Sequence, residues 1–227
     1  MNTKGMKVVL WGDSIGKGVV LDEVRGRYVI TPCSAASMVA KATGIELINR
    51  CRMGMTVGDG LATMQRDLNK GLEADAAVIE FGGNDCDFDW GRVSLDPTAP
   101  HLPKTPFEQF SEHLCTLIEK VRSRGMTPFL VNLPPLHAEK YFAFISGGDR
   151  SPDNILRFLG DKGHIYRFQE RYSLRVNQIA QACNCRLLDI RSAFLDLWNT
   201  NSLFCRDGIH PNTEGQRFIG QTILAQL

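Results

Sequence analysis

Short apolar runs alternate along this chain with longer stretches in which apolar residues recur at helical spacing. Apolar runs of four to eight residues bounded by glycine, proline or polar residues are typical of buried β-strands. The pattern predicts five strands, at residues 8–11, 45–49, 74–81, 127–133 and 185–190. The third run is almost continuously Ala, Val and Ile, which suits a strand covered on both faces.

Amphipathic stretches between the strands predict helices at residues 32–43, 57–70, 106–124, 165–183, 191–198 and 213–227. Thr56 and Thr213 are placed to cap two of them at the N-terminus. Pro106 suits the first turn of the long third helix, because proline tolerates that position. Alternating strands and helices indicate a parallel sheet with helices on both faces.

Two segments lack a regular period. Residues 86–106 contain four prolines and predict a long ordered loop, which in a compact domain is usually functional. Residues 136–163 predict a partly helical, lid-like excursion. Because no repeat or low-complexity linker divides the chain, we expect one domain over residues 1–227, with insertions at about 86–106 and 136–163.

Composition narrows the function classes. The chain has 227 residues, 43% hydrophobic and 22% charged, with a formal net charge of +1. These values are ordinary for a soluble globular protein, and no basic patch or membrane-spanning run points to a nucleic acid or membrane partner. The N-terminus carries no signal-like segment and the seven cysteines are scattered, so we expect reduced thiols and a cytoplasmic location. The sequence leaves homo-oligomer formation open.

Candidate chemistry begins where the first strand ends, at Gly12-Asp-Ser14. In an open α/β sheet, ligands bind beyond the carboxyl ends of the strands, so Ser14 suits a nucleophile if a base reaches it. Ser14 as a helix N-cap is the alternative. A phosphate-binding loop is excluded, because only three residues separate Gly12 from Gly16 and Lys17 is followed by glycine.

Three further motifs follow in order. Asp207-Gly-Ile-His210-Pro places a carboxylate three residues before an imidazole in a proline-bounded turn, which suits a general base and its orienting acid. Gly54 stands alone in Arg-Met-Gly-Met-Thr, and Asn84 lies in Gly-Gly-Asn-Asp after the third strand. Taken singly, each of these motifs is as typical of an ordinary turn.

Together the four motifs resemble those of the SGNH (GDSL-type) hydrolase family, over residues 12–211. The resemblance implies a flavodoxin-like, three-layer α/β/α sandwich with a five-stranded parallel sheet. It also implies a serine esterase or lipase that cleaves a small-molecule ester without metal or cofactor. The implied catalytic residues are Ser14, Asp207 and His210, and the implied oxyanion hole consists of Ser14, Gly54 and Asn84.

The substrate is less constrained. Family substrates include short-chain esters, acetylated sugars, lysophospholipids and thioesters, and the two insertions favour a covered pocket for a short-acyl or acetyl ester.

We expect Asp13 and Asp85 to hold loops by hydrogen bonds. Aromatic residues of the insertions are predicted to line the pocket, with His137 and His164 as further candidates, and the aromatic set comprises Trp90, Tyr141, Phe142 and Phe144. An acyltransferase or thioesterase using the same residues is an alternative, and a non-catalytic small-molecule-binding module is a weaker one.

Overall fold

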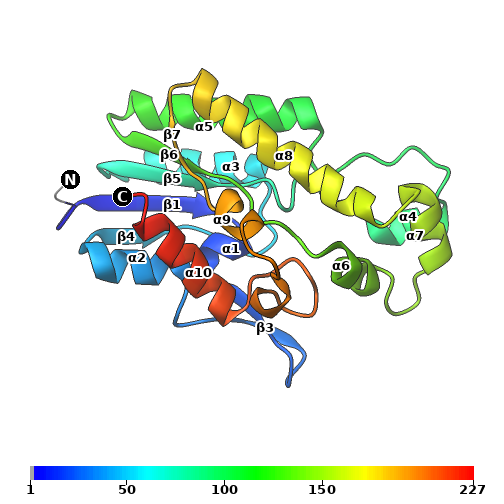
Figure 1. Ribbon diagram of the computed structural model, residues 1–227. Coiled ribbons are helices and arrows are strands. Elements are labelled where there is room, and N and C mark those ends of the chain that lie inside the picture. Colours follow the sequence, from blue (N-terminus) through cyan, green and yellow to red (C-terminus); the bar gives the residue numbers. More distant parts are fainter. Residues whose placement is uncertain (1–2) are drawn as a thin grey trace.

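The computed structural model describes residues 3–227 as a three-layer α/β/α sandwich (Figure 1). Its five central strands are all parallel, in the order β4-β1-β5-β6-β7. The predicted fold class and all five predicted strands are therefore confirmed. The strands are β1 (Lys7–Gly12), β4 (Glu46–Asn49), β5 (Ala76–Glu80), β6 (Thr127–Val131) and β7 (Arg186–Leu188).

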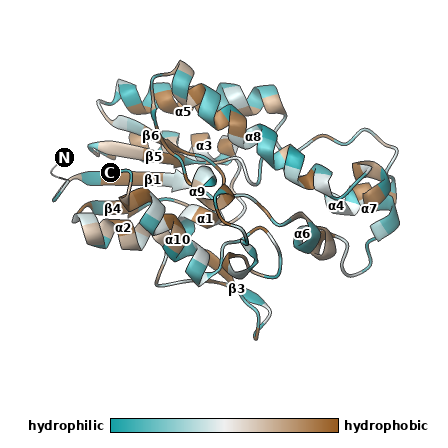
Figure 2. Ribbon diagram, in the orientation of Figure 1, coloured by the Kyte–Doolittle hydropathy of each residue, from teal (hydrophilic) through white to brown (hydrophobic). Residues whose placement is uncertain are grey.

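Helices cover both faces of the sheet (Figure 1). One face carries α3 (Val57–Asn69), α5 (Phe107–Ser123) and α8 (Gly163–Ala182), and the other carries α2 (Ala35–Thr43) and α10 (Thr213–Leu224). Their apolar stripes face the sheet and their hydrophilic residues face outward (Figure 2).

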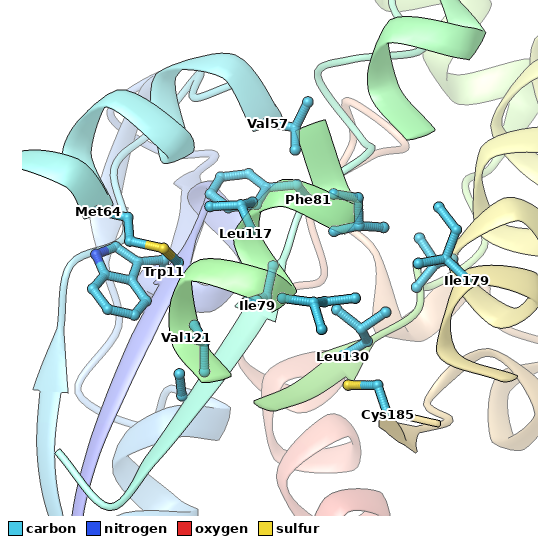
Figure 3. Packing of buried hydrophobic residues seen from close by; sticks show 14 of the residues in the cluster. Trp11, Val57, Met64, Ile79, Phe81, Leu117, Val121, Leu130, Ile179 and Cys185 are labelled. Atoms are coloured by element: carbon cyan, nitrogen blue, oxygen red, sulfur yellow. The ribbon is translucent and has the colours of Figure 1, made fainter. Parts of the chain in front are cut away.

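The larger core lies under α3, α5 and α8. Figure 3 shows Trp11 of β1 beside Met64 of α3, and Leu117 of α5 near Phe81, which follows β5. All four side chains are at most 1% exposed. This packing anchors the strands whose carboxyl ends carry the motifs.

Most helix boundaries follow the sequence signals. The predicted Thr56 cap is confirmed as a capping box with Asp59. The predicted Thr213 cap is wrong, because Asn212 accepts from the backbone N–H groups of Glu214 and Gly215 instead. α9 (Arg191–Leu195) is three residues shorter than predicted.

A hairpin that the sequence pattern did not predict follows the first motif. α1 (Ser14–Lys17) leads through Gly18 into β2 (Val19–Asp22) and β3 (Arg27–Ile30), which pair antiparallel apart from the main sheet. Gly18 has φ +79°, and a Cβ there would lie 2.3 Å from Ser34 Cβ. Glycine therefore lets the hairpin fold back against the start of α2.

The two insertions form one structure beyond the carboxyl ends of the strands (Figure 1). It contains α4 (Trp90–Leu95), α6 (Ala138–Ile145) and α7 (Pro152–Leu159), and the N-terminal part of α8 packs against it. The prediction of a long ordered loop at 86–106 is wrong over α4, where Asp89 caps the helix. The lid cluster, as we name its buried core, consists of Phe88, Trp90, Val93, Tyr141, Ile145, Ile155, Leu159 and Ile165.

The remaining described element is a single 3₁₀ turn, η1 (Asn201–Leu203), between α9 and the Asp207–His210 turn. Among residues 3–227, no helix is long and apolar enough to span a membrane.

Candidate active site

Ser14 is the first residue of α1, directly after β1. The Asp13 side chain caps this short helix by accepting from the backbone N–H of Ile15 at 2.8 Å, so Ser14 is not the N-cap. The Ser14 side chain is thereby left free to face the cavity beyond the sheet edge.

The structure joins Ser14 to the other end of the chain. His210 Nε2 lies 2.9 Å from Ser14 Oγ, and His210 Nδ1 lies 2.8 Å from Asp207 Oδ2. The carboxylate of Asp207 accepts a hydrogen bond from Nδ1–H of His210, so Nε2 of the neutral ring is the acceptor for the serine hydroxyl. The predicted serine, histidine and aspartate thus form one hydrogen-bonded chain.

Asp207 is fully buried, and every bond that holds it favours the ionised carboxylate. Its Oδ1 accepts from the backbone N–H groups of Ile209 and His210 at 3.1 and 3.0 Å. Its Oδ2 accepts from Tyr28 Oη at 3.0 Å as well as from His210. Burial opposes ionisation, yet the hydrogen bond and charge of His210 bring the pKa of Asp207 below its usual value.

Ser14, Gly54 and Asn84 carry hydrogen-bond donors and line one cavity. Gly54 lies in a turn at φ +79°, and Asn84 follows β5; both line the same cavity as Ser14. Among residues 3–227, no acceptor occupies the backbone N–H of Ser14 or of Gly54. Asn84 Nδ2 donates one hydrogen to Asp13 Oδ2 at 3.1 Å and keeps the other.

Asp13 and Asp85 hold loops, as predicted. Asp85 Oδ1 accepts from the backbone N–H of Val57 at 2.9 Å and from Thr105 Oγ1 at 2.6 Å. It therefore connects the start of α3 to the end of the first insertion. Burial raises the pKa of Asp85 to about 6.

The cavity has a volume of about 320 Å³ and runs from the Ser14–His210 pair into the lid structure. Trp90, Tyr141 and Phe144 line it, as predicted. Phe142 is outside the lining, because its ring packs under Lys162 Nζ at 5.1 Å instead.

Both flanking histidines are also outside the cavity. His137 caps α6, where Nδ1 accepts from the backbone N–H of Lys140 at 3.3 Å. His164 lies 2.7 Å from the carbonyl of Leu159 and stacks on Phe168. The suggestion that they line the pocket is therefore wrong.

Sequence reasoning missed two residues of the site. Tyr28 comes from the unpredicted hairpin, although the β-branched residues of 19–22 and 27–30 and Gly26 between them are a hairpin signal. Glu80 was treated only as part of a strand, although an acidic residue at the end of an apolar run is itself unusual. It is 3% exposed and lies directly beneath α1.

Neither a metal-binding group nor a disulfide occurs within residues 3–227. No cluster of three or more potential metal-ligating side chains is present there, and the seven cysteines are unpaired.

Known proteins provide an independent comparison. The chain matches the model of the GDSL-like lipase/acylhydrolase family over residues 10–218. No curated protein matches it.

Solved structures match over nearly the whole chain. A lipase/acylhydrolase from Enterococcus faecalis is 22% identical with a TM-score of 0.69, and the match covers 97% of this chain and 94% of that one. A catalytic mutant of Axe2, an acetylxylan esterase from Geobacillus stearothermophilus, is 20% identical with a TM-score of 0.67, covering 100% and 96%. LAE5, an α/β hydrolase from the metagenome of Lake Arreo, is 21% identical with a TM-score of 0.68, covering 98% and 94%.

At these identities the solved structures establish the fold, whereas the family match establishes descent. That match extends from β1 into α10 and includes all four motifs. The chain therefore belongs to the GDSL-like lipase/acylhydrolase family and is an ester-hydrolysing enzyme.

Proposed function

We propose that the protein hydrolyses a carboxylic ester through an acyl-serine intermediate. The observation that supports this most directly is the chain of hydrogen bonds from Ser14 Oγ through His210 to the buried Asp207. A serine hydroxyl is a weak nucleophile until a neighbouring base removes its proton. The Axe2 relative has catalytic mutants in which a serine, an aspartate or a histidine is replaced by alanine.

The reaction proceeds in two halves. Ser14 Oγ bonds to the ester carbonyl carbon while its proton passes to His210 Nε2, and the ester C–O bond breaks as His210 protonates the leaving alcohol. Water then attacks the acyl carbon and gives one proton to His210, and the bond between Ser14 Oγ and the acyl group breaks as His210 returns that proton to Oγ, which releases the acid and regenerates both residues. Asp207 holds the ring and stabilises the imidazolium that forms in each half.

Negative charge on the carbonyl oxygen is stabilised by the N–H groups of Ser14 and Gly54 and by the Asn84 amide. Preorganised donors of this kind are worth about 3–4 kcal/mol each when one is removed. The positive φ of Gly54 fits this role, because glycine adopts that conformation without strain.

The cavity refines the expectation of a short-acyl or acetyl substrate. A cavity of about 320 Å³ lies at the lower end of the range for small-molecule sites and exceeds what an acetyl group needs. The lining residues that belong to the lid cluster or pack against it are apolar or aromatic, namely Phe88, Trp90, Tyr141, Ile145, Leu159 and Phe168. We therefore propose that one half of the ester is a bulky apolar group seated against the lid cluster. Acetyl esters with a large alcohol half meet this description as well as longer acyl esters do.

A fluorophosphonate probe tests the nucleophile. Wild type is expected to react and to hydrolyse p-nitrophenyl esters, whereas Ser14→Ala does neither while keeping the far-UV circular dichroism of wild type. Ser192→Ala is a matched control, because that serine lies at the start of α9 and bonds Asp189 instead. Equal labelling of wild type and Ser14→Ala would contradict the proposal.

An ester panel tests the substrate half. One series varies the acyl length with p-nitrophenol as the leaving group, and a second series varies the alcohol of acetyl esters. We expect kcat/KM to rise with the apolar size of either the acyl half or the alcohol half, but not of both. Adding an acceptor alcohol or sugar separates hydrolysis from acyl transfer, because transfer yields a new ester in place of free acid.

A further inference from the structure

Glu80 is a buried carboxyl that the mechanism above does not use. It is the last residue of β5 and pairs in register with Gly12 of β1, so it ends directly beneath the turn that carries Ser14. Its Oε2 accepts from the backbone N–H groups of Asp13 and Gly16, each at 3.2 Å. Its Oε1 is buried and has no hydrogen-bond partner among residues 3–227.

Two glycines make room for this carboxyl. A Cβ at Gly12 would lie 2.7 Å from Glu80 Oε2, and one at Gly16 would lie 3.1 Å from the same oxygen. Any side chain at Gly12 would therefore displace Glu80 from the two N–H groups that it binds. Gly12 thus leaves room for the Glu80 carboxyl and also permits the turn that carries Ser14.

Glu80 and Asp13 are neighbouring buried carboxyls, and they differ in their surroundings. Burial raises the pKa of Glu80 well above its usual value, and the negative charge of Asp13 adds to the effect. Burial raises the pKa of Asp13 too, but the Ile15 N–H, the charge of His210 and the Asn84 amide all favour its ionised form. These surroundings favour ionisation of Asp13 over ionisation of Glu80.

An ionised Asp13 determines which way the Asn84 amide points. A carboxylate only accepts hydrogen bonds, so it selects Nδ2 of Asn84 at 3.1 Å and leaves the second N–H for the substrate oxygen. A second negative charge on Glu80 would oppose the oxyanion that forms above it. A neutral Glu80 would hold the turn without adding charge.

We propose that Glu80 is a positioning residue which, as a neutral acid, holds the Asp13–Gly16 turn and through Asp13 orients the Asn84 amide of the oxyanion hole. The inference rests on the proposed acyl-serine function. It assigns Glu80 no contact with substrate.

Two substitutions at Glu80 separate the effect of its charge from the effect of its hydrogen-bond acceptor. Glu80→Gln is neutral and keeps an oxygen for the two N–H groups, so kcat is expected to stay within about threefold of wild type. Glu80→Ala removes the acceptor, and kcat is expected to fall about 10–100-fold, less than the 10²–10³ lost with an oxyanion donor. KM should change by no more than about twofold in both variants, because ground-state binding is retained.

Glu80→Ala also leaves a cavity, so a control variant is needed that loses stability but keeps the geometry of the active site. Leu117→Ala truncates a fully buried residue of α5, away from the cavity, and should lower stability while keeping kcat. A loss of kcat in Glu80→Ala that Leu117→Ala does not share identifies positioning. Equal kcat in folded Glu80→Ala and wild type would overturn the proposal.

The pH profile and the infrared spectrum report the proton directly. Wild type should show a protonated-carboxyl C=O band at neutral pH that Glu80→Gln lacks, and its kcat should fall at alkaline pH as Glu80 ionises. Glu80 interacts electrostatically with Asp13 and Cys51, while Lys17 acts on Cys51 and His210 acts on Asp13. Cys51→Ala therefore serves as the control for a thiol titration, and it should keep the alkaline fall.

Failure of the proposed acyl-serine function and failure of the Glu80 proposal give different results. If wild-type ester hydrolysis does not require Ser14, the proposed function fails. If it requires Ser14 but Glu80→Gln loses as much kcat as Glu80→Ala, a neutral acid is not what the turn needs and only the Glu80 proposal fails. Absence of the protonated-carboxyl band would also overturn it.

Discussion

At the scale of single residues, the buried Asp207 carboxylate is held from four directions. Three bonds come from its own turn, and the fourth comes from Tyr28 on the distant hairpin. The Tyr28 ring also lies over His210, with ring centroids 4.9 Å apart. Tyr28 therefore contacts both Asp207 and His210, the two residues that form the hydrogen-bonded chain with Ser14.

Tyr28→Phe tests this contact. The phenylalanine keeps the ring but removes the hydroxyl donor, and a hydrogen bond to a charged group is worth about 1.5–3 kcal/mol. We expect kcat to fall about 10-fold while fluorophosphonate labelling of Ser14 persists. Steady-state kinetics check this, and an unchanged kcat would show that the three bonds within the turn suffice to hold Asp207.

Asp85 gives a pH-dependent prediction. Its folded-state pKa of about 6 exceeds the usual 3.8, so in the unfolded chain the carboxyl ionises first as pH rises. Each pKa unit corresponds to about 1.4 kcal/mol, so wild type should lose roughly 3 kcal/mol relative to Asp85→Asn between about pH 3 and pH 7, and about two thirds of that loss falls between pH 4 and 6. The difference should then stay level above about pH 7.

Urea unfolding of wild type and Asp85→Asn at several pH values measures this difference. The asparagine side chain of the variant keeps one oxygen for the Val57 and Thr105 donors, so the comparison isolates ionisation. A difference in unfolding free energy that is constant from pH 4 to 7 would contradict the prediction.

At the scale of elements, the Asp207–His210 turn is joined to the lid through backbone contacts. The N–H of His137 donates to the carbonyl of Gly208 at 2.7 Å, just before α6 begins. Gly208 has φ +76°, and a Cβ there would lie 2.6 Å from Tyr141 N and 2.7 Å from His137 O. Position 208 therefore needs glycine both for its positive φ and for the close approach of the α6 backbone.

Gly208→Ala is expected to push α6 away from the turn and to lower kcat at least about 10-fold, because small displacements of catalytic groups are costly. The matched control is Gly125→Ala, which has φ +75° but open space around the new Cβ. It should show only the backbone strain of about 1–2 kcal/mol. Kinetics and urea unfolding of both variants check the contrast, and equal effects would contradict it.

At the scale of the whole molecule, the chain has a large core between the sheet and helices α3, α5 and α8, and a separate lid cluster. Tyr172 of α8 donates to the carbonyl of Thr105 at 2.6 Å, and α8 itself runs from the lid to β7. This continuous helix favours the single domain predicted from the sequence.

Tryptophan fluorescence tests that prediction, because Trp11 lies in the large core and Trp90 lies in the lid cluster. Two variants each keep one of them, with the other and the exposed Trp198 replaced by phenylalanine. In each variant, the urea midpoints from fluorescence and from far-UV circular dichroism should coincide. An earlier midpoint at Trp90 would show that the lid unfolds on its own.

Local signals in the sequence were sufficient for much of this architecture. The five strands, the capping of α3 and the four motifs follow from short-range patterns, because strand burial and turn chemistry depend on neighbouring residues. α4 was missed because a six-residue helix containing glycine has little intrinsic stability and depends on packing in the lid cluster.

The sequence by itself determined the strand pattern, the order of the motifs and the residue types available for chemistry. Tertiary structure alone decided that residues 196 positions apart meet at 2.9 Å, that Tyr28 supports Asp207 and that Glu80 lies beneath the nucleophile turn. The physical reason is that parallel strands bring their carboxyl ends to one edge, whatever their separation along the chain. Contacts across that edge depend on packing between elements, which local patterns do not encode.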